Sequence, residues 1–153
     1  MLGFERDAAG EWVALLECGH RRHVRHRPPL SSYPWIADAD ARAAKLGSTL
    51  ECPACARLEL PTDAVAYRTT AEFDEATLPP ALRRDHDTRP GVWARVEVLA
   101  GRLRLVLPAL GLDRVLTTGE HAIVPPELSH HVEPLGPMRM RLAFLRAPTQ
   151  TRP

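Results

Sequence analysis

Hydrophobic and polar residues alternate over short stretches along most of this chain, and a period of two predicts strands. In "EWVALLEC" (11–18) every second residue lies on one apolar face. Gly19 then allows a tight turn, after which "HVRHR" can return as the partner strand. A helix is predicted over 38–47, because an aspartate stands at its start and a glycine just past its end, and "STLEC" (48–52) is predicted as a further strand.

The second half of the chain predicts one strand after another. The predicted strands are "AVAYRTT", "GVWARVEVLAG", "GRLRLVLP", "DRVLTT", "HAIVP", "HHVEP" and "MRMRLAFLR". In the last of these, methionine, leucine and phenylalanine face one way and arginines the other. Turn signals recur about every ten residues, which is typical of a β-sandwich or small barrel. One short helix is expected within 72–85.

The chain is predicted to divide near residues 56–63 into two domains. Residues 1–58 hold all three cysteines and a dense group of histidines, whereas residues 60–148 hold the regular strands. The first segment is too small for a large core and needs an added staple. The second can bury a single, modest core. We therefore expect a mainly β protein whose two parts behave as separate folding units.

Composition narrows the cellular setting. The 153 residues carry a formal net charge of +1, so the net charge produces no long-range electrostatic attraction to nucleic acid or an anionic membrane. No apolar run approaches the ~20 residues of a membrane span, and the early charges do not fit a signal peptide. An odd number of cysteines argues against a disulfide framework. We expect a cytoplasmic protein with reduced thiols and no membrane partner.

Metal-capable side chains are concentrated in "ECGHRRHVRH" (17–26), and "CPAC" (52–55) supplies the other two cysteines. Zinc prefers four thiolate or imidazole ligands in a tetrahedron, and two tight turns that each give two ligands build one with little strain. The predicted zinc ligands are Cys18, Cys52, Cys55 and either His20 or His23. The first of the two histidines lies nearest the turn, and the second would reach from the returning strand. His26 is expected at the surface.

Two other interpretations of the cysteines remain. A redox pair of the thioredoxin kind would place CxxC at the start of a helix, but "ARLELPT" after it does not have a helical pattern. Plain free thiols are the second alternative. Structural zinc is favoured, because its apparent free energy of ~10–16 kcal/mol is what a small segment with a thin core requires.

The N-terminal half resembles a small bacterial Cys/His domain of unknown function. The likeness covers residues 3–57 and is carried by "GFERDAAGEWVALLECGHRRHVRHRPP", then "PW", "LG" and "LECPAC" in that order. The family brings no established activity. The resemblance implies a β-rich module that binds metal, which agrees with the ligand spacing.

The C-terminal half resembles two related groups. "GEHAIVPPELSH" is similar to the second motif of cupins, which would make His130 a metal ligand, although Glu127 stands where glycine is usual. More closely, "LPTDAVAYRTTAEFDEATLPPALRRDHDTRPGVWARVEVLAGRLRL" and "IVPPELSHHVEPLGPMRMRLAFLR" resemble the cupin-like domain of tellurite-resistance TehB and YeaR-type proteins, over residues 60–146. The resemblance implies a double-stranded β-helix barrel. The sequence ends soon afterwards, so we expect no methyltransferase.

The barrel offers a second candidate metal site. His86, His130 and Glu133 could form a two-histidine, one-carboxylate face, which suits iron and also zinc or manganese. Glu133 joins that face only if its strand bulges; otherwise it points away from His130. Trp93 is expected close to the mouth of the pocket. The alternative is that the two histidines only hydrogen-bond loops.

Two classes of function stay open. The favoured one is a non-enzymatic binding or stress-response protein, with structural zinc in the first part and a small molecule or oxyanion in the barrel. The other is a metal-dependent cupin enzyme, an oxygenase or isomerase. A weaker alternative is a nucleic-acid or protein adaptor that uses the arginines at 21, 22, 25 and 27. A homodimer would form through the cupin-like domain.

Overall fold

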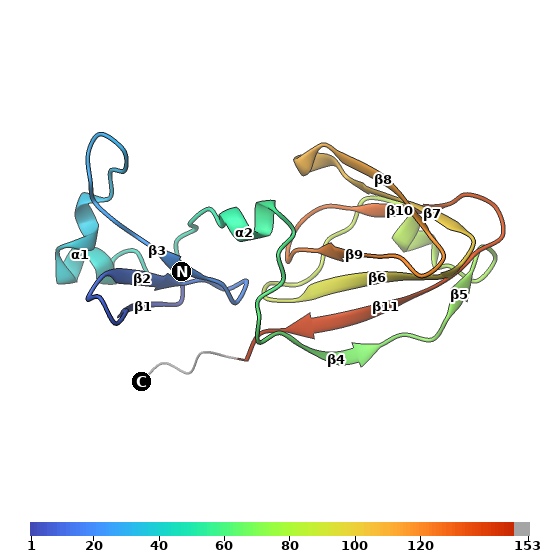
Figure 1. The fold of residues 1–153 in the computed structure, drawn as a ribbon, viewed down its shortest axis with the longest axis horizontal. Coiled ribbons are helices and arrows are strands. Elements are labelled where there is room, and N and C mark those ends of the chain that lie inside the picture. The colour runs from blue at the N-terminus through green and yellow to red at the C-terminus, as the bar shows by residue number, and fades with distance from the viewer. Residues whose placement is uncertain (149–153) are drawn as a thin grey trace.

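The computed structural model describes residues 1–148 and consists of two parts joined side by side (Figure 1). The first part contains an antiparallel three-stranded sheet in the order β1-β2-β3. Its strands are β1 (Gly3–Arg6), β2 (Trp12–Leu15) and β3 (Arg21–His23). Its helices are η1 (Pro34–Ile36), α1 (Ala39–Ala43) and α2 (Pro53–Ala56).

The second part is made of two antiparallel sheets. One sheet has the order β4-β11-β6-β9, with β5 paired to β11, and the other has the order β10-β7-β8. The strands of the first sheet are β4 (Val65–Thr69), β5 (Phe73–Asp74), β6 (Trp93–Ala100), β9 (His121–Val124) and β11 (Arg139–Arg146). Those of the second are β7 (Arg102–Leu107), β8 (Leu112–Thr117) and β10 (His131–Pro134). Two short 3₁₀ turns complete this part, η2 (Pro80–Arg83) and η3 (Pro108–Leu110).

The predicted alternation decides which side chains form the cores. On β11, Met140 and Leu142 are buried between the sheets, whereas Arg139 and Arg141 are exposed. Buried side chains of β6 and β7 complete this core. In the first part, Ala14 and Leu16 belong to a smaller core. The prediction of a mainly β chain, with a small first part that holds the cysteines and a larger strand-rich second part, is therefore confirmed.

Two local predictions need correction, and a third is incomplete. The segment 48–52 is not a strand, because it leads directly into α2 and pairs with no neighbour. The helix expected over 38–47 is shorter, Ala39–Ala43, with Asp38 capping it by accepting a hydrogen bond from Ala41 N at 2.7 Å. Within 72–85 the one short helix expected there is the 3₁₀ helix η2, but the segment also contains the strand β5, which the sequence did not predict.

A third apolar cluster connects the two parts. Trp93, Ala143 and Leu145 are buried, and Cys18 and Cys55 pack against them. Figure 1 shows α2, which carries Cys55, between the N-terminal sheet and the barrel. The candidate zinc ligands therefore lie at the junction and not at the far end of the small part.

No helix among residues 1–148 is long and apolar enough to cross a membrane.

Candidate metal centre and barrel cavity

Four side chains from two separated turns meet in one cluster. The ligand atoms of Cys18, His20, Cys52 and Cys55 all lie within 4.8 Å of one another. The three Sγ atoms lie 3.6, 3.4 and 3.7 Å from Nδ1 of His20. A tetrahedral zinc with ordinary bond lengths places sulfur and nitrogen ligands about 3.6 Å apart. The donor set and its spacing therefore fit a four-coordinate metal ion.

Local backbone geometry explains why these four atoms converge. Cys18 and His20 flank the turn between β2 and β3, and Cys52 and Cys55 flank the first turn of α2. Gly19 has φ +90°, and a Cβ at this position would collide with Ala147. Only glycine meets both conditions, because the left-handed region is costly for other residues and the end of the barrel fills the space.

The thiols influence one another's ionisation strongly. A hydrogen bond from the Cys55 thiol is the main cause that lowers the pKa of Cys18 to about 5. Burial raises the pKa of Cys52, and the pKa of Cys55 is raised because its thiol donates to Cys18. Without a cation, the cluster therefore holds one thiolate near neutral pH, because several neighbouring thiolates would repel. A divalent ion removes that repulsion.

The other N-terminal histidine and the arginines have different partners. His23 Nε2 lies 2.8 Å from Asp7 Oδ2 on the exposed side of the sheet, so His20 is the histidine of the cluster. Of the four arginines in the basic strip, three form ion pairs with acids of the same part. They are Arg21 with Glu5, and Arg25 and Arg27 with Glu11. The strip is therefore charge-compensated.

Trp93 connects the metal cluster to the barrel. Its Nε1 donates a hydrogen bond to the Cys18 carbonyl oxygen at 2.8 Å, and its side chain is completely buried. The His20 and Trp93 rings pack edge to face with centroids 5.5 Å apart. The expectation that Trp93 lies at the mouth of the pocket is wrong, because the odd positions of β6 face outward and the even positions face the barrel interior.

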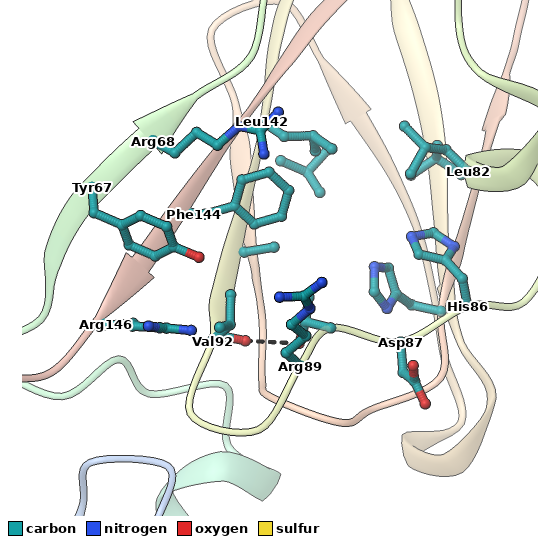
Figure 2. Close-up of a pocket in the computed structure, with 15 residues that line it drawn as sticks. Tyr67, Arg68, Leu82, His86, Asp87, Arg89, Val92, Leu142, Phe144 and Arg146 are labelled. Atoms are coloured by element: carbon teal, nitrogen blue, oxygen red, sulfur yellow. Dashed lines mark hydrogen bonds between the residues drawn. The ribbon is translucent and has the colours of Figure 1, made fainter.

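The barrel contains an open cavity of about 450 Å³. Its floor is apolar and is formed by Val92, Ala94 and Val96 together with Leu142 and Phe144. Its rim carries polar and charged side chains (Figure 2). These are Tyr67, Arg68, His86, Asp87, Arg89 and Arg146, whereas His130 lines the wall and is buried. The volume lies within the range of about 300–1,000 Å³ that is usual for small-molecule sites.

His86 and His130 face each other across this cavity wall. Their backbones form an isolated antiparallel bridge, and their ring centroids are 4.2 Å apart. Nδ1 of His86 donates to Arg84 O at 2.9 Å, and Nδ1 of His130 donates to Leu128 O at 2.8 Å. Because a carbonyl only accepts, each Nδ1 carries a proton, so the neutral form of either ring has its lone pair on Nε2. Burial lowers the pKa of His130, which keeps it neutral.

Glu133 does not join the two histidines. Residues 131–134 pair with β7 in regular register, without the bulge that Glu133 would need. Its carboxylate bonds Arg104 NH1 at 2.8 Å and lies 3.4 Å from His131 Nε2. Glu97, the other acid near the cupin-like motif, pairs with Arg95 and Arg141 instead. Within residues 1–148, the four-residue Cys/His cluster is the one group of three or more ligands gathered closely enough for a metal ion.

Sequence reasoning missed the arginines on the cavity rim. Arg68, Arg89 and Arg146 are separated by 21 and 57 positions, so no local motif groups them. Only the pairing of β4 with β11 brings the first and last together. It missed the link through Trp93 for a similar reason, since only the packing of β6 against the distant turn at Gly19 brings the indole N–H to the Cys18 carbonyl.

Comparison with known families agrees with both resemblances seen in the sequence. Residues 2–59 match the model of a family described as a protein of unknown function (DUF3565). Residues 68–142 match the model of the TehB-like domain. No curated protein sequence matches the chain significantly.

Solved structures resemble the barrel part. TehB from Haemophilus influenzae aligns with a TM-score of 0.52 and 24% identity, over 57% of this chain and 33% of that one. The chain thus spans about a third of that protein. A protein from Escherichia coli strain K12 aligns with a TM-score of 0.55 and 25% identity, over 59% of this chain and 97% of that one. A cupin-2 domain protein from Shewanella frigidimarina gives a TM-score of 0.35 at 15% identity, over 52% and 64%.

Proposed function

We propose that this chain, a DUF3565-type module joined to a TehB-like barrel, is a non-enzymatic binding protein. In this proposal zinc holds the first part together, and the barrel cavity takes a small molecule or oxyanion. The observation that carries it is the cluster of three sulfurs around His20 Nδ1 at 3.4–3.7 Å, which has the chemistry and spacing of a structural zinc site.

A structural role for zinc follows from the closed ligand set. All four positions of a tetrahedron are filled by protein atoms, which leaves none for a reacting water. The small core around Ala14 and Leu16 offers little stability of its own, so metal binding supplies folding free energy. When bound, the ion would also neutralise the crowded thiolates.

The zinc proposal is tested with two matched histidine variants. Native mass spectrometry and elemental analysis of the wild type should show one tightly held zinc per chain. His20→Ala should lose most of it, whereas His23→Ala should keep it, because His23 bonds Asp7 and lies outside the cluster. Equal zinc content in all three proteins would contradict the ligand set.

Binding by the barrel rests on the cavity beside His86 and His130. A fragment screen by protein NMR, using neutral, acidic and basic compounds, should give shifts confined to residues that line it. A screen in which no fragment shifts Val92, Ala94 or Phe144 would contradict a binding role.

A metal-dependent enzyme is the second candidate, and one observation favours it. Both Nδ1 atoms of the histidine pair are held by backbone carbonyls, which orients two free Nε2 atoms as metal ligands commonly are. Iron, zinc or manganese would then need its remaining ligands from substrate or water. A second metal equivalent that disappears in His86→Ala and His130→Ala would support this candidate, and a single equivalent would overturn it.

The proposed physiological role is a stress response, and it rests on the resemblance to tellurite-resistance proteins over residues 60–146. A homodimer through the barrel belongs to the same proposal. Growth of a deletion strain on tellurite, and light scattering of the purified chain, test the two points. Growth equal to the parent strain, or a monomer at all concentrations, would contradict them.

A further inference from the structure

We propose that the barrel cavity takes a small organic anion, whose acidic group is held by Arg68, Arg89 and Arg146 and whose apolar body lies on the cavity floor. This inference rests on the proposed function, because it names the ligand class of the same cavity. It also excludes a bare inorganic oxyanion as the preferred ligand.

The three arginines reach the cavity from different elements. Arg68 lies on β4, Arg146 ends β11, and Arg89 lies in the loop before β6. Figure 2 shows the Arg89 side chain rising between the two sides of the cavity, with Arg68 and Arg146 on the side of Tyr67. Planar guanidinium groups offer paired N–H donors that match a carboxylate or phosphate.

These three arginines line the cavity without an acidic partner in the described part of the chain. Nine other arginines form ion pairs, whereas within residues 1–148 none of the three makes an ion pair or donates a side-chain hydrogen bond. Arg146 only stacks over the Tyr67 ring at 5.1 Å. Their donors are therefore available to a ligand, and mutual repulsion of three cations is relieved when an anion binds.

Other groups at the rim do not cancel this charge. Asp87 is the one acid that lines the cavity, and Figure 2 shows its carboxylate turned away from the histidine rings. His130 is neutral because burial lowers its pKa. The cavity thus keeps an excess of positive charge at neutral pH.

The floor explains why an organic body is needed. Valine, alanine, leucine and phenylalanine side chains line the same cavity as the arginines. A bare oxyanion would leave these apolar side chains in contact with water. An apolar body covering them gains about 25 cal/mol for each Å² removed from water. A ligand with both features uses the whole cavity, whereas an inorganic ion uses only its rim.

Three probes separate charge from apolar contact. Benzoate has both features, benzamide has nearly the same shape without the charge, and inorganic phosphate has charge without the body. Affinities are measured by NMR titration of the full chain. We expect benzoate to bind at least tenfold more tightly than either other probe, and to shift the amides of Val92 and Ala94. Its affinity should fall with added salt, because the contact with the arginines is screened.

Arginine variants assign the charge. Arg89→Gln should weaken benzoate binding at least tenfold and leave benzamide binding unchanged. Its fold should be intact, because the Arg89 side chain is exposed and makes no ion pair or hydrogen bond in the described chain. Arg102→Gln is the matched control, since Arg102 is exposed and does not line the cavity. It removes one positive charge elsewhere and should leave both affinities unchanged.

Every outcome is informative. Benzamide binding as tightly as benzoate would overturn the role of the arginines but leave the cavity a binding site. Phosphate binding as tightly, without shifts at the floor, would point to a bare oxyanion and overturn the organic body. If no probe binds while neutral or basic fragments still occupy the cavity, this inference fails alone. If no fragment binds there, the proposed binding function fails with it.

Discussion

Trp93→Phe tests whether the barrel supports the metal cluster. The substitution removes the N–H that bonds the Cys18 carbonyl at 2.8 Å and shortens a completely buried side chain. An unsatisfied buried carbonyl costs about 1–3 kcal/mol. A cavity of roughly 40 Å³, at about 24 cal/mol per Å³, adds about 1 kcal/mol. We expect a total loss of about 2–4 kcal/mol in the free energy of unfolding.

The same change should act on the metal. Cys18 and His20 lie in the same turn, and the hydrogen bond from Trp93 to the Cys18 carbonyl fixes that turn against the barrel. Without this bond the turn can open more easily. Zinc transfer to a chromogenic chelator should then be faster, by about tenfold for every 1.4 kcal/mol of zinc-binding free energy that is lost. Urea unfolding followed by circular dichroism gives the stability, and the chelator's absorbance gives the rate.

Trp35→Phe is the matched control for this experiment. Trp35 is a partly buried tryptophan of the first part, and within residues 1–148 its indole N–H donates no hydrogen bond. It should lose less stability and release zinc at the wild-type rate. Equal losses in both variants, with zinc release unchanged in Trp93→Phe, would refute the view that the barrel supports the cluster.

The remaining predictions concern the turn, protons and the division of the chain. Gly19→Ala should lower the melting temperature more than Gly10→Ala. Both positions have positive φ, which costs a residue with a side chain about 1–2 kcal/mol, but only a Cβ at Gly19 would collide with Ala147. Equal melting temperatures for the two variants would argue against that contact. Zinc binding at pH 7 should release about two protons, as measured by calorimetry in buffers of different ionisation enthalpy. Cys18, with a pKa of about 5, is already a thiolate, whereas the pKa values of Cys52 and Cys55 are raised and these two thiols must lose their protons. Release of three protons would contradict this. Acid should correspondingly release the metal, and a zinc content unchanged down to pH 4 would contradict the ligand set. Burial lowers the pKa of His130 below its unfolded value near 6.5, so the unfolded chain binds more protons, and the free energy of unfolding should fall as the pH drops below that value. His130→Asn should remove this part of the pH dependence of stability. If the variant lost as much stability as the wild type between pH 7 and 5.5, the reasoning would be contradicted. A strong chelator should abolish hydrogen-exchange protection in residues 1–57 and, in the barrel, only near Trp93 and the end of β11; loss throughout the barrel would mean one cooperative unit.

The fold and the cysteine cluster follow from local signals. Alternation over "MRMRL" assigns the two faces of the first half of β11, because polar and apolar residues take turns there. The run "LAFLR" is apolar on both faces, and the sequence does not show that Ala143 and Leu145 are buried at the junction. Two cysteine-bearing turns are enough to predict a tetrahedral site. Whether His20 or His23 completes it depends on the register of β2 and β3, which pairs Val13 with His23 and directs the latter to the exposed side near Asp7.

The cavity could be predicted only in part. Glu133 is three residues beyond His130, and the alternation of side chains along a strand predicts that the two point to opposite faces of the sheet. The regular register of β10 with β7 agrees with this. The rim arginines depend on strand pairing between distant segments, which carries no local signature. Glu127 shows a different limit: it has φ +57°, a left-handed conformation that a sequence pattern does not assign to a glutamate.

Strand β6 lies between the metal cluster and the barrel cavity. Its outward residue Trp93 contacts the metal cluster, and its inward neighbours Val92 and Ala94 line the cavity. Two ligands that bias the position of one strand are thermodynamically linked, and linkage is reciprocal. Any factor by which zinc changes the affinity of a cavity ligand is therefore the factor by which that ligand changes the affinity for zinc. The metal content of the protein would then report on the supply of the small molecule, and the reverse.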